Sequence, residues 1–104
     1  RPASACLSSR IPYGTEVTVE ALSMVDRAEA FLKAQGFRQV RVRHHGEIAR
    51  IEVPSEEMAR FFEGETHQKV AERLKEIGYR YVTLDLQGYR SGSLNEGLLT
   101  IQKG

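Results

Sequence analysis

The stretch VRVRHHGEIARIEV, residues 40–53, decides the fold. On both sides of His45-Gly46, apolar residues alternate with charged ones. This alternation is typical of strands that place one face on a core and the other toward solvent. We therefore expect a strand over 37–43, a tight turn at His45-Gly46 and a returning strand over 48–53.

A helix is expected before this hairpin, between Thr18 and Gly36. Thr18 is a good N-cap, and glycine commonly follows the last residue of a helix. Between them, apolar residues recur at the spacing of one helix face. The members of this apolar stripe are Ala21, Leu22, Val25, Ala28, Phe31 and Leu32.

Beyond the hairpin the pattern predicts two helical segments and a third strand. Ser55, followed by acidic residues, is expected to cap a short helix that runs through Phe62. A further helix is expected over 65–77, with Gly78 as its end. The third strand is expected over 81–86, with three apolar side chains on one face: Val82, Leu84 and Leu86.

The order helix, strand, strand, helix, strand predicts a small α+β two-layer sandwich, a three-stranded sheet with the helices on one face. The other face would be polar, and its members would be Arg41, Arg43, Arg50, Glu52, Thr83 and Asp85. A turn at His45-Gly46 would place Arg41 opposite Arg50, and like charges in such positions repel. Either an anion lies between the guanidinium groups, or Glu52 and Asp85 neutralise them, and the sequence leaves both alternatives open.

Length and charge restrict the function classes. The 104 residues suffice for one domain, and the net charge of +1 gives no argument for binding nucleic acid or a membrane. No apolar run has the length of a membrane span, and one cysteine, unable to form an internal disulfide, fits a cytoplasmic protein. The chain begins without methionine, so we expect a fragment: a cysteine loop over 1–17, an α+β domain over 18–96 and a tail over 97–104.

Two residues stand out for chemistry. Cys6 lies in a loop of small residues where Arg10 would favour a reactive thiolate, although an inert, half-buried thiol remains the alternative. Glu29 falls inside the apolar stripe of the first helix, where a carboxylate needs a partner or must reach solvent from the stripe's edge. No metal site is expected, because one cysteine without ligand spacing does not make a zinc site.

The strings PASACLSSRIPYG (2–14) and DLQGYRSGS (85–93) together resemble one family. It comprises the ATP-dependent sacrificial sulfur transferases, which help to build the nickel-pincer cofactor of lactate racemase. The resemblance extends from residue 2 to about residue 96, and the cysteine loop is its most specific part. It implies a cytoplasmic ATP-pyrophosphatase (PP-loop) enzyme of which this chain would be the carboxy-terminal part.

The resemblance also implies a mechanism. In that family, an amino-terminal domain uses ATP and magnesium to adenylate a carboxylate of a nicotinate-derived mononucleotide. The cysteine that matches Cys6 attacks the activated carboxyl group, and its Cβ–S bond then breaks, leaving a thiocarboxylate and dehydroalanine. By resemblance, Cys6 is the sulfur donor and Glu29 an ordering or proton-transfer group. The residues that would hold the anionic substrate, with Arg10 also supplying positive charge, are Ser9, Arg10, Arg41, Arg43 and Arg90.

One departure and two alternatives accompany this interpretation. The Ser-Gly-Gly-x-Asp-Ser phosphate loop of ATP-pyrophosphatases is absent from these residues, so this chain alone should not bind ATP well or turn over. A non-catalytic association module, like the dimerisation domain of GMP synthetase, would instead have an inert Cys6. A nucleic-acid-binding domain is disfavoured by the charge. Because open strand edges invite pairing, we also expect a homo-oligomer, assembled through the sheet or the loop over 88–93.

Overall fold

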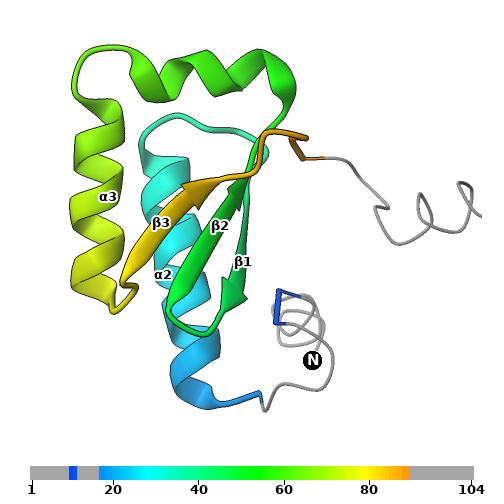
Figure 1. Ribbon diagram of the computed structural model, residues 1–104, viewed down its shortest axis with the longest axis vertical. Helices are drawn as coiled ribbons and strands as arrows, with labels where there is room; N and C mark the ends of the chain where they lie inside the picture. Colours follow the sequence, from blue (N-terminus) through cyan, green and yellow to red (C-terminus); the bar gives the residue numbers. More distant parts are fainter. Residues whose placement is uncertain (1–9, 12–16, 90–104) are drawn as a thin grey trace, which may run out of the picture.

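The computed structural model describes residues 10, 11 and 17–89 (Figure 1). Cys6, Ser9 and Arg90 lie outside the described residues, as do most of the expected cysteine loop and the expected tail. No helix in the described ranges combines the length and the apolar character that a membrane span requires.

Helix α2, Val19–Ala34, forms where the apolar stripe predicts it. The Thr18 hydroxyl accepts a hydrogen bond from the backbone N–H of Ala21 at 3.0 Å, which satisfies one of the donors that the first turn leaves unpaired. The helix ends at Gln35, and Gly36 follows with a φ of 105°, a conformation that favours glycine. The predicted helix and both of its boundaries are thereby confirmed.

The sheet contains β1 (Arg41–His45), β2 (Ile48–Glu52) and β3 (Tyr81–Leu84), hydrogen-bonded in the order β1-β2-β3. β1 and β2 are antiparallel, whereas β3 runs parallel to β2. Parallel neighbours need a long crossover connection, which the 3₁₀ helix η1 (Ser55–Phe62) and α3 (Thr66–Ile77) provide. β1 and β3 are therefore the two edges of the sheet among the described residues.

Helices α2 and α3 pack on the same face of the sheet, and Figure 1 shows α2 behind the strands and α3 beside β3. The core between the layers draws its side chains from every helix and from the sheet: Ala28, Leu32, Phe37, Val42, Ala49, Ile51, Val53, Phe61, Val70 and Leu74. The predicted α+β two-layer sandwich with helices on one face is confirmed.

The hairpin register differs from the expected one. The loop is Gly46-Glu47, not His45-Gly46, so Arg41 pairs with Glu52 and Arg43 pairs with Arg50. Gly46 has a φ of 60° and stands first in the two-residue loop, which is the position where a type II′ turn requires glycine. The shift is by two positions, so every residue keeps its expected face, but the prediction that Arg41 opposes Arg50 was wrong.

Three local predictions also differ from the structure. The first strand starts at Arg41, because Phe37 leaves the strand and stacks on Phe61 with ring centroids 4.5 Å apart. Ser55 does not cap the short helix: Pro54 precedes η1, and no side chain makes a capping hydrogen bond. The third strand ends at Leu84, and Leu86, predicted to face the core, is 81% exposed.

Candidate functional site

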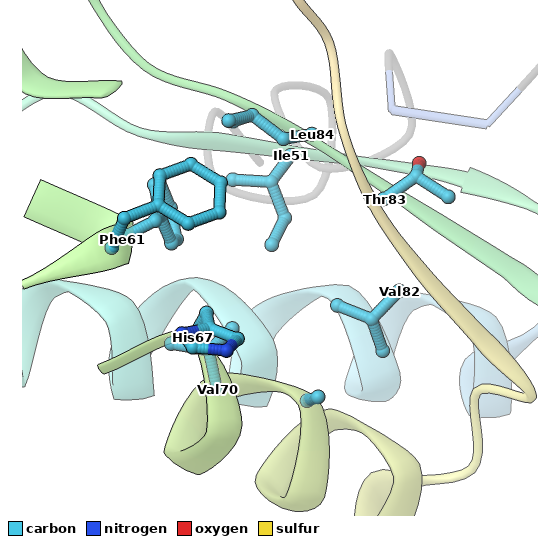
Figure 2. A pocket seen from close by; sticks show the side chains of 9 residues that line it. Ile51, Phe61, His67, Val70, Val82, Thr83 and Leu84 are labelled. Atoms are coloured by element: carbon cyan, nitrogen blue, oxygen red, sulfur yellow. The ribbon is translucent and has the colours of Figure 1, made fainter. Parts of the chain in front are cut away.

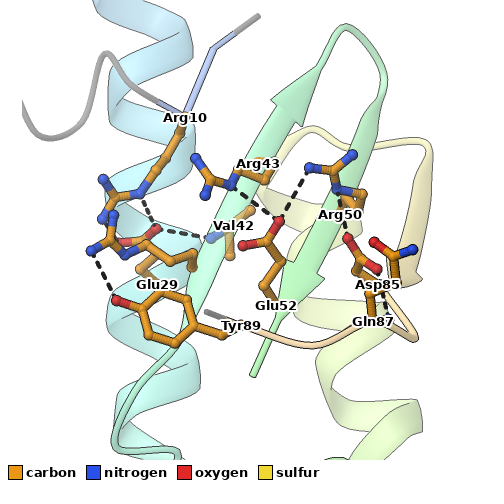
Figure 3. Close-up of polar contacts among 10 residues, drawn as sticks. Arg10, Glu29, Val42, Arg43, Arg50, Glu52, Asp85, Gln87 and Tyr89 are labelled. Atoms are coloured by element: carbon orange, nitrogen blue, oxygen red, sulfur yellow. Dashed lines mark hydrogen bonds and ion pairs between the residues drawn. The ribbon is translucent and has the colours of Figure 1, made fainter. Parts of the chain in front are cut away.

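The candidate site lies on the sheet face opposite the helices and extends to the free edge of β1. We use the name arginine face for five side chains that gather there: Arg41, Arg43, Arg50, Glu52 and Asp85. Figure 3 shows the last four of them together. They come from β1, β2 and the residue after β3, and alternation along each strand turns them away from the core.

Within the arginine face, Glu52 and Asp85 neutralise the like-charged pair formed by Arg43 and Arg50. One Glu52 carboxylate oxygen, Oε2, lies 3.2 Å from Nε of Arg43 and 3.1 Å from a terminal nitrogen of Arg50. Asp85 approaches Arg50 at 3.5 Å. Of the two alternatives that the sequence left open, carboxylate neutralisation therefore holds for this pair, and Glu52 is 6% exposed beneath it.

Arg41 has a different environment. A terminal guanidinium nitrogen of Arg41 donates to the Tyr89 hydroxyl at 3.2 Å, and the guanidinium carbon lies 5.2 Å from the centre of the Tyr89 ring. Among the residues that the structure describes, no carboxylate lies within 4.0 Å of the Arg41 nitrogens, so its described partners are neutral. A half-buried guanidinium group with a neutral partner keeps its capacity to bind a carboxylate or a phosphate.

At the β1 edge, Glu29 forms a buried ion pair with Arg10. Oε2 of Glu29 accepts from Nε of Arg10 at 2.8 Å, and Oε1 accepts from a terminal nitrogen of Arg10 at 3.3 Å. Oε2 also accepts from the backbone N–H of Val42 at 2.9 Å (Figure 3). The Arg10 carbonyl accepts from the backbone N–H of His44 at 2.7 Å. Glu29 and Arg10 thus occupy two outward-facing donors of an edge strand, which would otherwise be free to pair with another chain.

This arrangement explains a carboxylate inside an apolar stripe. Glu29 is 6% exposed and Arg10 is 8% exposed, and buried ions persist where they are paired and hydrogen-bonded. Glu29 therefore has the partner that its position in the sequence required, and it does not reach solvent. Its two oxygens are both occupied by donors, which favours the ordering role over proton transfer.

A buried pair that the sequence analysis did not identify, His44 and Tyr79, lies on the core side of β1. Nδ1 of His44 is 2.8 Å from the Tyr79 hydroxyl, and the rings meet edge to face with centroids 5.4 Å apart. Burial, and then the charge of His45, lower the pKa of His44. Burial, and then Glu29, raise the pKa of Tyr79. The alternation of β1 was the available signal, because it assigns His44 to the same face as Val42.

His44 should make the stability of the fold depend on pH. The pKa values of His44 and His45 are both lowered from 6.5, so the folded chain favours the neutral rings. As pH falls below 6.5, the unfolded chain takes up protons first, and the free energy of unfolding should decrease. In urea unfolding between pH 7 and pH 5, His44→Asn should weaken this dependence because asparagine keeps a hydrogen-bonding group near Nδ1 and does not titrate.

His45→Asn is the matched comparison, because the His45 side chain is the more exposed of the two. Partial desolvation and then Arg50 and Arg43 lower the pKa of His45, and Glu52 opposes them. The double variant should show the flattest pH profile. An unchanged slope in His44→Asn would mean that the buried histidine is not the source of the dependence.

The structure brings together four of the seven residues that the sequence singled out. Arg10, Glu29, Arg41 and Arg43 lie along β1 and its free edge. Cys6, Ser9 and Arg90 lie outside the described residues, although Ser9 directly precedes Arg10 and Arg90 directly follows Tyr89. Glu52 and Asp85 lie on this face as the alternation predicts, whereas Tyr89, the partner of Arg41, was not predicted for the site.

Comparisons with known proteins found three relatives that match most of this chain. The chain is 48% identical over 98 residues to an uncharacterized protein of Synechocystis, covering 94% of this chain and 37% of that protein. It is 45% identical over 100 residues to the pyridinium-3,5-bisthiocarboxylic acid mononucleotide synthase of Lactiplantibacillus plantarum, covering 96% of this chain and 36% of the synthase. An uncharacterized protein of Methanocaldococcus jannaschii is 26% identical over 90 residues, with 86% of this chain and 34% of that protein covered.

The chain thus spans a little over a third of the length of these relatives. No protein-family model matches it. The similarity to the synthase nevertheless covers nearly all of this chain.

Proposed function

We propose that this chain is part of an ATP-dependent sulfur transferase in which Cys6 supplies the sulfur and the β1 side of the sheet holds an anionic substrate. The name of the Lactiplantibacillus relative supports a mononucleotide that acquires two thiocarboxylic groups on a pyridinium ring. The substrate would be the corresponding carboxylate, which carries a phosphate and carboxyl groups. Each of these anions suits a guanidinium partner.

One observation carries this proposal: the two family-like strings meet on β1. Arg10, from the cysteine string, contacts His44 through its backbone and Glu29 through its side chain. Tyr89, from the second string, contacts Arg41. Residues 79 positions apart in the chain therefore converge on one five-residue strand. Cys6 is four residues before Arg10, a spacing that permits its sulfur to reach a substrate bound at Arg41.

The proposed chemistry has two steps. The Cys6 thiolate attacks the adenylated carboxyl carbon, so a carbon–sulfur bond forms and AMP leaves. A base then removes the Cα proton of Cys6, and the Cβ–S bond breaks. Its electron pair leaves with sulfur as the thiocarboxylate, while the protein keeps dehydroalanine. The protein loses one sulfur and two hydrogens, which equals one H₂S. Such a nucleophile benefits from nearby positive charge.

The described residues would bind and orient the reactants. Arg41, with its neutral described partner, is the principal anion-binding residue in this proposal, and Arg43 lies two residues further along the same face. Glu29 fixes Arg10 at the base of the cysteine loop. Ser9 and Arg90 are further candidates for contacts with the substrate. The 104 residues contain no phosphate loop, so none of them is assigned to ATP or magnesium.

Arg41→Ala should weaken binding of the mononucleotide dicarboxylate, measured by calorimetry with the full-length protein. A hydrogen bond to a charged group contributes about 1.5–3 kcal/mol, so the dissociation constant should rise about 10- to 150-fold. Stability should change by less than about 1 kcal/mol, because the substitution removes only a contact with Tyr89 on a half-buried surface.

Arg73→Ala is the control with the same change in charge, because Arg73 lies on α3 and pairs there with the exposed Glu76. This variant should bind the ligand as the unmodified protein does. If Arg41→Ala instead unfolds like a core deletion, by about 2–5 kcal/mol, Arg41 is a structural residue and the assignment fails.

A further inference from the structure

The β3 edge is the second free edge of the described sheet, and it is built differently from the β1 edge. The backbone N–H of Tyr81 donates to Glu47 and that of Asp85 donates to Ile51, so both point toward β2. Backbone groups alternate along a strand, so the N–H and C=O groups of Val82 and Leu84 point outward. No described residue occupies them as Glu29 and Arg10 occupy the donors of β1.

The sequence of β3 lacks the residues that usually prevent an edge strand from pairing with another chain. Tyr81–Leu84 contains no charged residue and no proline, which are the usual devices that prevent an edge strand from pairing. Apolar surface also gathers near it: Tyr81 is 54% exposed, Leu86 is 81% exposed and Phe62 is 69% exposed. Exposed apolar groups beside an open edge are typical of a surface that another chain covers.

A pocket of about 260 Å³ lies between β3 and the amino-terminal half of α3 (Figure 2). Val82 and Leu84 form its sheet side, while Phe61, His67 and Val70 close it from the helical side. A strand added to β3 would turn alternate side chains toward this pocket, in the manner of recognition by strand addition.

We propose that a second copy of this chain pairs with β3, strand against antiparallel strand, so that the two sheets become continuous. In this arrangement a two-fold axis passes between the two copies at Thr83, so that Thr83 of one protomer lies opposite Thr83 of the other. Hydrogen-bonded pairs would then form between Val82 of one protomer and Leu84 of the other, and Tyr81 would lie opposite Asp85.

Like-charge repulsion disfavours the parallel direction of pairing. The Arg80 side chain, 69% exposed and paired with Glu47 at 3.7 Å, lies at one end of the strand, and Asp85, which pairs with Arg50 at 3.5 Å, follows the other end. Antiparallel pairing brings the Arg80 end of one strand to the Asp85 end of its partner. Parallel pairing in register would place Arg80 against Arg80 and Asp85 against Asp85, and like charges opposite each other are destabilising.

The test uses a disulfide at the axis. Facing residues of a non-hydrogen-bonded antiparallel pair have Cα atoms about 4.5 Å apart, which a disulfide can span. In full-length protein that carries Cys6→Ala, Thr83→Cys should yield a covalent dimer on mild oxidation. Gln68→Cys, an exposed position on α3, should not. The control is the Cys6→Ala protein without a new cysteine, which shows whether any other thiol forms a disulfide. The result does not depend on sulfur transfer, because Cys6 is absent from all of these proteins.

Thr83→Lys should weaken self-association up to about fivefold in light scattering, by placing two ammonium groups opposite each other, and Gln68→Lys should not. Thr83 is exposed, and its hydroxyl donates one hydrogen bond, to the Ala49 carbonyl at 3.0 Å, so both of its substitutions should lower stability by about 1 kcal/mol and preserve the fold. An assembly larger than one chain that forms no Thr83→Cys disulfide would overturn the proposal. So would a monomer in which the Val82 and Leu84 amides resist hydrogen exchange, because another part of the same polypeptide would then cover the edge.

Discussion

Full-length protein that completes one turnover with ATP, magnesium and the mononucleotide dicarboxylate is expected to lose the mass of one H₂S, at Cys6. Cys6→Ser is expected to abolish sulfur transfer completely while carboxylate adenylation continues. A serine hydroxyl is far less nucleophilic than a thiolate at neutral pH. Intact-mass spectrometry and peptide mapping measure the first result, and release of pyrophosphate measures adenylation.

The position of the described residues supports this expectation. Arg10, four residues after Cys6, is held by Glu29 and by the backbone of His44. Arg10 therefore anchors the carboxy-terminal end of the Cys6 segment to the β1 edge. Dehydroalanine lacks the sulfur atom on which thiol exchange acts, and this chain contains no second cysteine that could serve as another donor.

The mass of the protein after turnover also distinguishes the two candidate functions, the sulfur transferase and the non-catalytic association module. A matched incubation with Arg41→Ala should show the same mass loss at saturating substrate and less of it at low substrate concentration, because only binding is weakened. If the mass of the unmodified protein stays constant through a demonstrated turnover, the sulfur has another source. An inert Cys6 would favour the association module, and the β3 pairing proposed above would then be its principal activity.

The regular elements of this fold could be predicted from the sequence because each has a strong local signal. Thr18 and Gly36 mark the two ends of α2, and alternation through residues 40–53 gives the hairpin and both of its faces. The end of β3 had a local signal too, since aspartate three positions before glycine is typical of a type I turn. The Asp85 carboxylate accepts from the Gln87 N–H at 2.9 Å, and this turn ends the strand before Leu86.

The site was harder to predict, because its contacts join residues that are distant in the chain. The sequence indicated that Glu29 needs a partner, but pairing with Arg10 depends on how residues before α2 return to the β1 edge. The loop position of Gly46 then determined which arginines face each other. The prediction placed the two-residue loop one position too early, at His45-Gly46. It therefore gave the correct face for each residue and the wrong cross-strand pairs.

Glu29→Ala is expected to destabilise the fold by about 3–5 kcal/mol, the usual effect of removing one partner of a buried ion pair. The substitution removes the carboxylate that Arg10 contacts through two nitrogens, and it removes the acceptor of the Val42 N–H. Urea unfolding followed by circular dichroism measures the change. Asp26→Ala, at an exposed position of the same helix, should stay within about 0.5 kcal/mol of the unmodified chain.

Glu29→Gln separates ordering from proton transfer. The amide oxygen can still accept from the Val42 N–H but no longer carries the charge that pairs with Arg10, so a smaller loss of stability is expected.

Arg10→Ala, combined with Glu29→Ala in a double-mutant cycle, should show a coupling energy of about 0.5–3 kcal/mol. If Glu29→Gln keeps full stability and binds the mononucleotide normally, yet loses sulfur transfer, the carboxylate moves a proton and the ordering role is wrong. If stability, binding and transfer decline together, Glu29 acts through Arg10, by fixing the segment that carries Cys6 against the edge of β1.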